Sequence, residues 1–63
     1  MVKERITMRL EHFYHLVGRP DIVIFAFAEC ADGNVYYQHT DGWGELEWQP
    51  VREFYGDFER IRD

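Results

Sequence analysis

Residues 22–30 read IVIFAFAEC, residues 32–34 read DGN and residues 35–40 read VYYQHT. A run that is apolar on both faces and β-branched at its start is typical of a strand in the middle of a sheet. The Asp-Gly pair after it supplies the positive-φ residue that a tight hairpin requires. These three segments therefore predict two antiparallel central strands joined by a hairpin turn, in a mainly β domain.

The segments before this hairpin extend the predicted sheet. Apolar and polar side chains alternate over residues 3–10, which predicts a half-buried strand. The alternation stops over residues 11–17, where we expect a bulge or a strongly bent strand, with a short helical turn as the alternative. Pro20 fixes its own φ and biases the residue before it, so residues 18–21 are expected to form a turn.

The segments after the hairpin are a turn over residues 41–44, a strand over residues 45–48 and a helical turn that begins at Pro50. Apolar residues then recur at helical spacing up to Ile61, so one interpretation is a single helix to the end of the chain. The favoured interpretation ends the helix near Tyr55, with Gly56 at its C-cap and residues 57–62 forming a fifth strand.

These elements together predict a small SH3-like barrel, or a strongly bent antiparallel meander of four to five strands, with a short C-terminal helical turn. A chain of 63 residues allows one domain, residues 1–63. So short a chain buries only about 60% of the surface that its unfolded form exposes. Its five Phe, four Tyr and two Trp exceed what so small a core needs. Some rings are therefore expected at the surface or in a homodimer interface.

The C-terminal half resembles a family of small bacterial and phage proteins of uncharacterised function with an SH3-like barrel. The resemblance covers residues 34–62 and is carried by WQPVREF at residues 48–54 and FERI at residues 58–61. That family has a Tyr-rich strand, a Trp-x-x-Pro tail and a Phe-Glu ending; here Pro50 follows Trp48 by two positions rather than three. The resemblance implies a small accessory domain with no catalytic residues.

Cysteine content and hydropathy indicate a cytoplasmic protein. Cys30 is the single cysteine, so an intramolecular disulfide is impossible, and a lone thiol fits a reducing compartment. The N-terminal residues lack the apolar stretch of a signal peptide. The longest apolar run, residues 22–28, is far shorter than the ~20 residues that span a bilayer. We therefore expect no membrane association.

Charge is distributed unevenly along the chain, which carries a net charge of −5. Residues 20–51 contain six acidic residues and no Lys or Arg. This composition argues against phosphate-backbone binding and favours a partner protein with a basic or mixed surface, although acidity also serves solubility. One alternative is a nucleic-acid-binding barrel that uses the terminal arginines, namely Arg5, Arg9, Arg19, Arg60 and Arg62. The other alternative is a structural homo-oligomer.

The sequence predicts neither an enzyme nor a metal or cofactor site. The candidate ligands for zinc are Cys30 and three histidines, but His12 and His15 point to opposite faces of a strand and cannot converge there. The chain contains no serine, so a serine nucleophile is excluded. Glu45 and Glu47 have the spacing of a glycosidase pair on one strand face, but the domain is too small to hold a sugar in a cleft.

Aromatic and acidic residues near the second turn form the candidate partner-binding site. Trp43 lies between two glycines, where we expect an exposed binding residue with one tyrosine packed beside it. The carboxylates would complement a basic partner. The alternative is that one of the tyrosines and Trp48 lie in the core and that Trp43 covers one end of the barrel. The candidate residues are Trp43, Tyr36, Tyr37, Asp41, Glu45 and Glu47.

Overall fold

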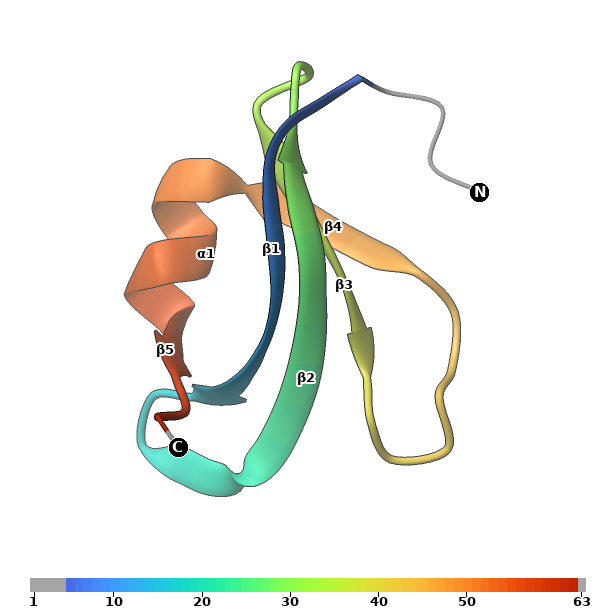
Figure 1. Ribbon diagram of the computed structural model, residues 1–63. Helices are drawn as coiled ribbons and strands as arrows, with labels where there is room; N and C mark the ends of the chain where they lie inside the picture. Colours follow the sequence, from blue (N-terminus) through green and yellow to red (C-terminus); the bar gives the residue numbers. More distant parts are fainter. Residues whose placement is uncertain (1–4, 63) are drawn as a thin grey trace.

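The computed structural model describes residues 5–62, which form one antiparallel sheet and one short helix. The strands run along the sheet in the order β4-β3-β2-β1-β5, and the sheet bends strongly without closing into a barrel (Figure 1). The prediction of a mainly β, strongly bent meander is thus confirmed. The elements are β1 (Ile6–Leu16), β2 (Arg19–Cys30), β3 (Asn34–His39), β4 (Glu47–Pro50), α1 (Val51–Asp57) and β5 (Phe58–Arg60).

The hairpin between β2 and β3 has the turn that its sequence predicts. Gly33 has a φ of +86°, and its N–H donates to the carbonyl of Cys30 at 3.0 Å. The Asp32 carboxylate accepts a hydrogen bond from the backbone N–H of Asn34 at 3.1 Å. A positive φ is accessible to glycine without strain, and an Asp side chain can satisfy the backbone two residues ahead. These bonds determine where β3 begins.

The first strand contains the bulge expected near its middle, and residues 11–17 form no helical turn. Glu11 has a φ of +53°, and the pairing of β1 with β2 shifts between Arg9 and His12. The turn before β2 is shorter than predicted, because Arg19 and Pro20 already belong to the strand. Pairing of β2 with β3 begins only at Ile24, so the missing N–H of Pro20 removes no bond from that ladder.

At the C-terminus the helix-plus-strand interpretation is confirmed, but the helix ends at Asp57 rather than near Tyr55, and the last strand is Phe58–Arg60 rather than residues 57–62. Gly56 lies inside α1, and the C-cap is Phe58, whose N–H donates to the carbonyl of Phe54. The helix continues past Gly56 because Phe54 and Phe58 both reach the core, where their rings stack at 5.0 Å. The bounds predicted for the preceding strand, residues 45–48, are wrong by two positions, since β4 begins at Glu47 and ends at Pro50.

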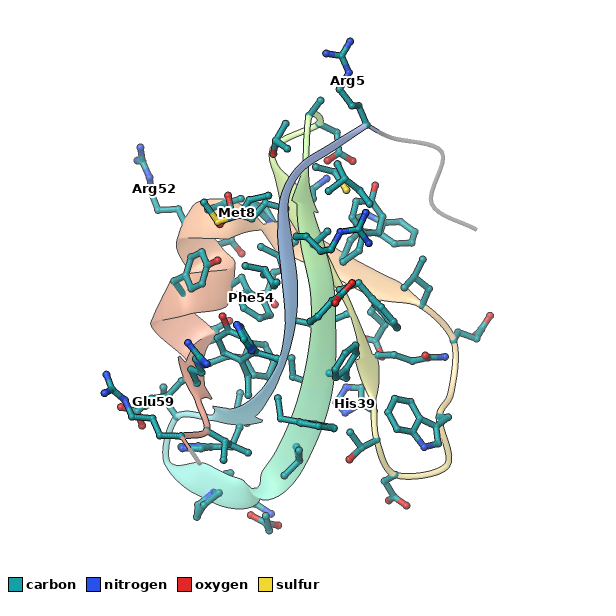
Figure 2. The ribbon with its side chains drawn as sticks, viewed as in Figure 1. Arg5, Met8, His39, Arg52, Phe54 and Glu59 are labelled. Carbon is teal, nitrogen blue, oxygen red and sulfur yellow. The ribbon has the colours of Figure 1, made fainter. Side chains whose placement is uncertain are left out.

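The core lies between α1 and one face of the sheet (Figure 1), with Phe54 of α1 facing the sheet (Figure 2). Phe54 is fully buried, and its ring contacts the rings of Tyr14, Tyr37 and Phe58 at 5.0–5.6 Å. Edge-to-face and offset contacts of this kind stabilise aromatic clusters beyond simple burial. The buried cluster comprises Tyr14, Ile24, Ala26, Val35, Tyr37, Phe54 and Phe58.

We expect the domain to lose stability above about pH 10, where tyrosines ionise in the unfolded chain. Burial raises the pKa of Tyr55, and so does the hydrogen bond that its hydroxyl donates to Glu29 at 2.6 Å. Burial, followed by the charges of Glu47 and Asp57, raises the pKa of Tyr37. Above about pH 10 the unfolded chain therefore binds fewer protons than the folded chain, so the free energy of unfolding falls as pH rises.

Urea titrations at several alkaline pH values would measure this dependence. Tyr55→Phe keeps the ring and removes the ionisable hydroxyl, so its stability should fall less steeply with pH than that of the wild type. Parallel pH profiles for the two proteins would show that Tyr55 makes no contribution.

Candidate functional site

The face of the sheet opposite α1 carries a second set of aromatic residues. Successive strand residues point to opposite faces, and residues paired across antiparallel strands point to the same face. Phe25 lies between the core residues Ile24 and Ala26 and pairs with Phe13, so both phenylalanines face away from α1. We call this side the open face; its rings belong to Phe13, Phe25, Phe27, Tyr36, Trp43 and Trp48.

Four of these rings form a cluster centred on Phe25. Its ring lies 5.1 Å from the rings of both Phe13 and Phe27, and 6.4 Å from that of Trp43, always in an edge-to-face arrangement. Phe13 and Trp43 are 47% and 53% exposed, whereas Phe25 and Phe27 are half-buried. The cluster is therefore a small apolar platform whose outer rings are accessible to a partner.

Trp43 lies in the loop between β3 and β4, as expected from its glycine neighbours. Its φ is +46°, a backbone conformation that costs a bulky residue free energy. The side-chain amide of Gln38 donates to the carbonyl of Gly44 and so holds this loop against β3. The exposed position of Trp43 agrees with its proposed role as an anchor. Its ring neighbour among the described contacts is Phe25, whereas the ring contacts described for Tyr36 and Tyr37 are with Trp48 and with core rings, respectively.

Tyr36 and Trp48 form a second ring pair on the open face. They are paired across β3 and β4, with ring centroids 5.7 Å apart. The Tyr36 hydroxyl donates to the Asp32 carboxylate, and this hydrogen bond is the main cause that lowers the pKa of Asp32. Trp48 is 59% exposed, so the expectation that it lies in the core is wrong.

Tyr37 lies on the other side of the sheet from Tyr36. It is buried in the core, and its hydroxyl donates to the side-chain oxygen of Gln49 at 3.4 Å. The alternative in which one tyrosine of the pair is a core residue is therefore confirmed for Tyr37. A partner that docks on the open face does not reach its ring.

The acidic residues of the candidate site are also divided. Asp41 and Glu45 are exposed in the loop that carries Trp43. Glu47 pairs with Tyr37, so it lies toward the α1 side of the sheet, where its carboxylate is 3.5 Å from Nε2 of His39. Because β4 begins only at Glu47, the two glutamates do not share a strand face as predicted. Asp41 and Glu45 thus belong to the loop that carries Trp43, whereas Glu47 lies on the α1 side of the sheet.

The other ionisable residues considered from the sequence are dispersed. Within residues 5–62, no group of three or more potential metal ligands lies together. His15 is 3.4 Å from Glu59, across the pair that joins β1 to β5. Arg5 projects beyond the β2–β3 hairpin, whereas β5 and the C-terminus lie near the opposite end of the sheet (Figure 1, Figure 2). Arg5 and the C-terminal arginines proposed for nucleic-acid binding therefore lie toward opposite ends of the sheet (Figure 1, Figure 2).

The candidate residues predicted from the sequence omitted four members of the open face, namely Phe13, Phe25, Phe27 and Trp48. The three phenylalanines come from strands far in sequence from the Trp43 loop, and the apolar run that contains Phe25 and Phe27 has no polar residues to show which face is buried. The only available signal was the excess of rings over what a small core requires.

Comparisons with known proteins leave the family of this chain open. No family model matches it, and neither the curated proteins nor the solved structures contain a match. Among the described residues, no helix has the length and apolar character needed to cross a membrane. The open face and its surroundings are therefore the features of this chain that bear on its function.

Proposed function

We propose that this chain is a non-catalytic protein-interaction module that docks its open face, together with the loop between β3 and β4, on another protein. The observation that carries the proposal is the exposure of Phe13, Trp43 and Trp48, each about half or more accessible on one side of the sheet. Soluble monomers rarely expose contiguous apolar patches larger than roughly a few hundred Å², and groups of exposed apolar side chains on one face often mark an interaction site. Tryptophan and tyrosine are also the residues most enriched at the energetic centres of interfaces.

Charge around the open face supports a partner with a basic or mixed surface. Asp32 lies beside the Tyr36–Trp48 pair, and Asp41 and Glu45 lie beside Trp43. Residues 20–51 supply no Lys or Arg to neutralise these carboxylates. A positively charged partner would be steered toward this side at long range, whereas the phosphate backbone of a nucleic acid would be repelled.

The biological setting that fits this proposal is an inhibitor or adaptor of the kind encoded by phages, acting in the cytoplasm. Its support is the resemblance of residues 34–62 to small SH3-like phage and bacterial proteins, together with the single cysteine. An inhibitor of this type needs a compact domain and one binding surface. The open face provides such a surface without a catalytic group.

Trp43→Ala is expected to abolish capture of the partner from bacterial lysate while leaving the circular dichroism spectrum unchanged. Loss of an aromatic anchor at an interface centre weakens binding by about 2 kcal/mol or more, which is about thirtyfold in affinity. Affinity capture with wild type, Trp43→Ala and Trp48→Ala, followed by mass spectrometry, measures the effect.

Met8→Ala is the matched control for this experiment. Met8 is 54% exposed, as Trp43 is, but it lies on the side of β1 that faces α1 (Figure 2). It should therefore retain the captured protein. Equal capture by all variants, or equal loss in the Met8 control, would remove the support for docking through the open face.

A further inference from the structure

The surroundings of Trp43 indicate which chemical group the partner presents. The ring of Trp43 meets that of Phe25 edge to face at 63°, and the indole is 53% exposed. Gly42 and Gly44 flank it without side chains, and a Cβ atom at either position would meet nothing within 4 Å. The indole therefore packs against the ring of Phe25, and the glycines on either side of it in the sequence do not cover it.

Two carboxylates lie next to this indole in the same loop. Asp41 and Glu45 are each two residues from Trp43, and both are exposed. Two of the arginines already have carboxylate partners elsewhere in the fold, because Arg9 pairs with Glu11 and Arg19 pairs with Asp21, each at 3.1 Å. The loop thus combines an accessible aromatic face with two negative charges that no Lys or Arg of residues 20–51 neutralises.

Resting on the proposed function, we propose that the partner inserts a cationic side chain, arginine in particular, which stacks on Trp43 between Asp41 and Glu45. A cation over an indole face is attracted by the negative potential of the ring, and the planar guanidinium also stacks on it. The carboxylates add attraction to the same charge. A purely apolar partner side chain would instead desolvate both carboxylates without compensation.

Charge complementarity also argues against a second copy of this chain as the occupant. In an isologous dimer through the open face, the same acidic loop approaches the same surface of the other copy. Each copy brings a net charge of −5, so self-association places like charges together, whereas a basic partner neutralises them.

A hollow at the start of the loop that carries Trp43 offers space for the apolar part of a long cationic side chain. It has a volume of about 320 Å³ and is lined by Asp21, Ile22, Val23, His39, Thr40 and Asp41. Ile22 and Val23 provide apolar surface, and Asp41, which belongs to the same loop as Trp43, adds a carboxylate. Arg and Lys side chains commonly bury their methylene groups in this way while the charged end stays near carboxylates.

Fluorescence titration of a Trp48→Phe variant tests the proposal, because Trp43 is then the single indole. The probe is a short peptide of alternating arginine and glycine; matched peptides replace arginine by lysine or by citrulline, which keeps the shape and removes the charge. We expect saturable quenching by the arginine peptide and binding of the citrulline peptide that is weaker by about tenfold. Asp41→Asn combined with Glu45→Gln should weaken arginine-peptide binding by about fivefold.

The possible outcomes separate this proposal from the proposed function. Equal affinity for the citrulline and arginine peptides, or no saturable quenching, overturns the cationic site; if lysate capture still depends on Trp43, the interaction module itself stands. If the titration shows no saturable quenching and lysate capture does not depend on Trp43, both proposals fail. Quenching that rises with protein concentration without peptide, together with a dimer in sedimentation, would identify a second copy as the occupant and overturn the cationic site.

Discussion

Replacing Phe54 by alanine is expected to leave the domain largely unfolded at room temperature. Phe54 is fully buried and contacts three other core rings, so its removal empties the centre of the cluster between α1 and the sheet. A buried Phe→Ala substitution typically costs about 3–5 kcal/mol. At about 0.05–0.15 kcal/mol per residue, a chain of this length has a total stability of about 3–9 kcal/mol, and so small a core places it toward the lower end of that range.

Urea denaturation followed by circular dichroism would measure this loss, with Phe13→Ala as the matched control. The control removes the same side chain from the open face, where Phe13 is 47% exposed. We expect it to cost about 1 kcal/mol, because much of its ring is already in contact with water. A Phe54→Ala domain that stays folded, or one no less stable than the control, would show that the core does not depend on α1.

Local sequence signals predicted the elements of this fold well. The Asp-Gly pair determines the β2–β3 hairpin through a turn in which Gly33 has a positive φ, and this requirement is independent of the rest of the chain. The loss of alternation after residue 10 correctly indicated the bulge at Glu11. Such features depend on neighbouring residues, so a single sequence contains the information needed to predict them.

The sequence could not show which face of the sheet each aromatic side chain occupies, because this depends on how the strands are paired. The run from Ile22 to Ala28 is apolar on both sides, so it contains no polar positions to mark the exposed face. The β2–β3 pairing also shifts between Ala26 and Ala28, and a shift of one residue exchanges the two faces. Residues 45–48 do alternate, and this alternation suggested that Trp48 faces the core, but β4 begins only at Glu47 and pairs Trp48 with Tyr36 on the open face.

The neighbouring residues Tyr36 and Tyr37 provide the sharpest test of this assignment, because alanine substitution should destabilise the domain much more at Tyr37 than at Tyr36. Tyr37→Ala removes a ring that contacts Phe54 and Phe58 in the core, and we expect a loss of about 3–5 kcal/mol in the free energy of unfolding. Tyr36→Ala removes a ring that pairs with Trp48 and a hydroxyl bonded to Asp32, which should cost only about 1–2 kcal/mol.

Binding should show the reverse order, provided that it is measured on folded protein. Tyr36→Ala removes part of the open face and should weaken partner capture even under conditions where the variant is folded. Tyr37→Phe keeps the core ring and removes only the hydroxyl that donates a hydrogen bond to Gln49. This variant should therefore stay folded and capture the partner as the wild type does. If Tyr37→Phe lost the partner while Tyr36→Ala retained it, the binding surface would lie on the α1 side of the sheet. The open face would then be a second small core that stabilises the bend of the sheet rather than a docking surface.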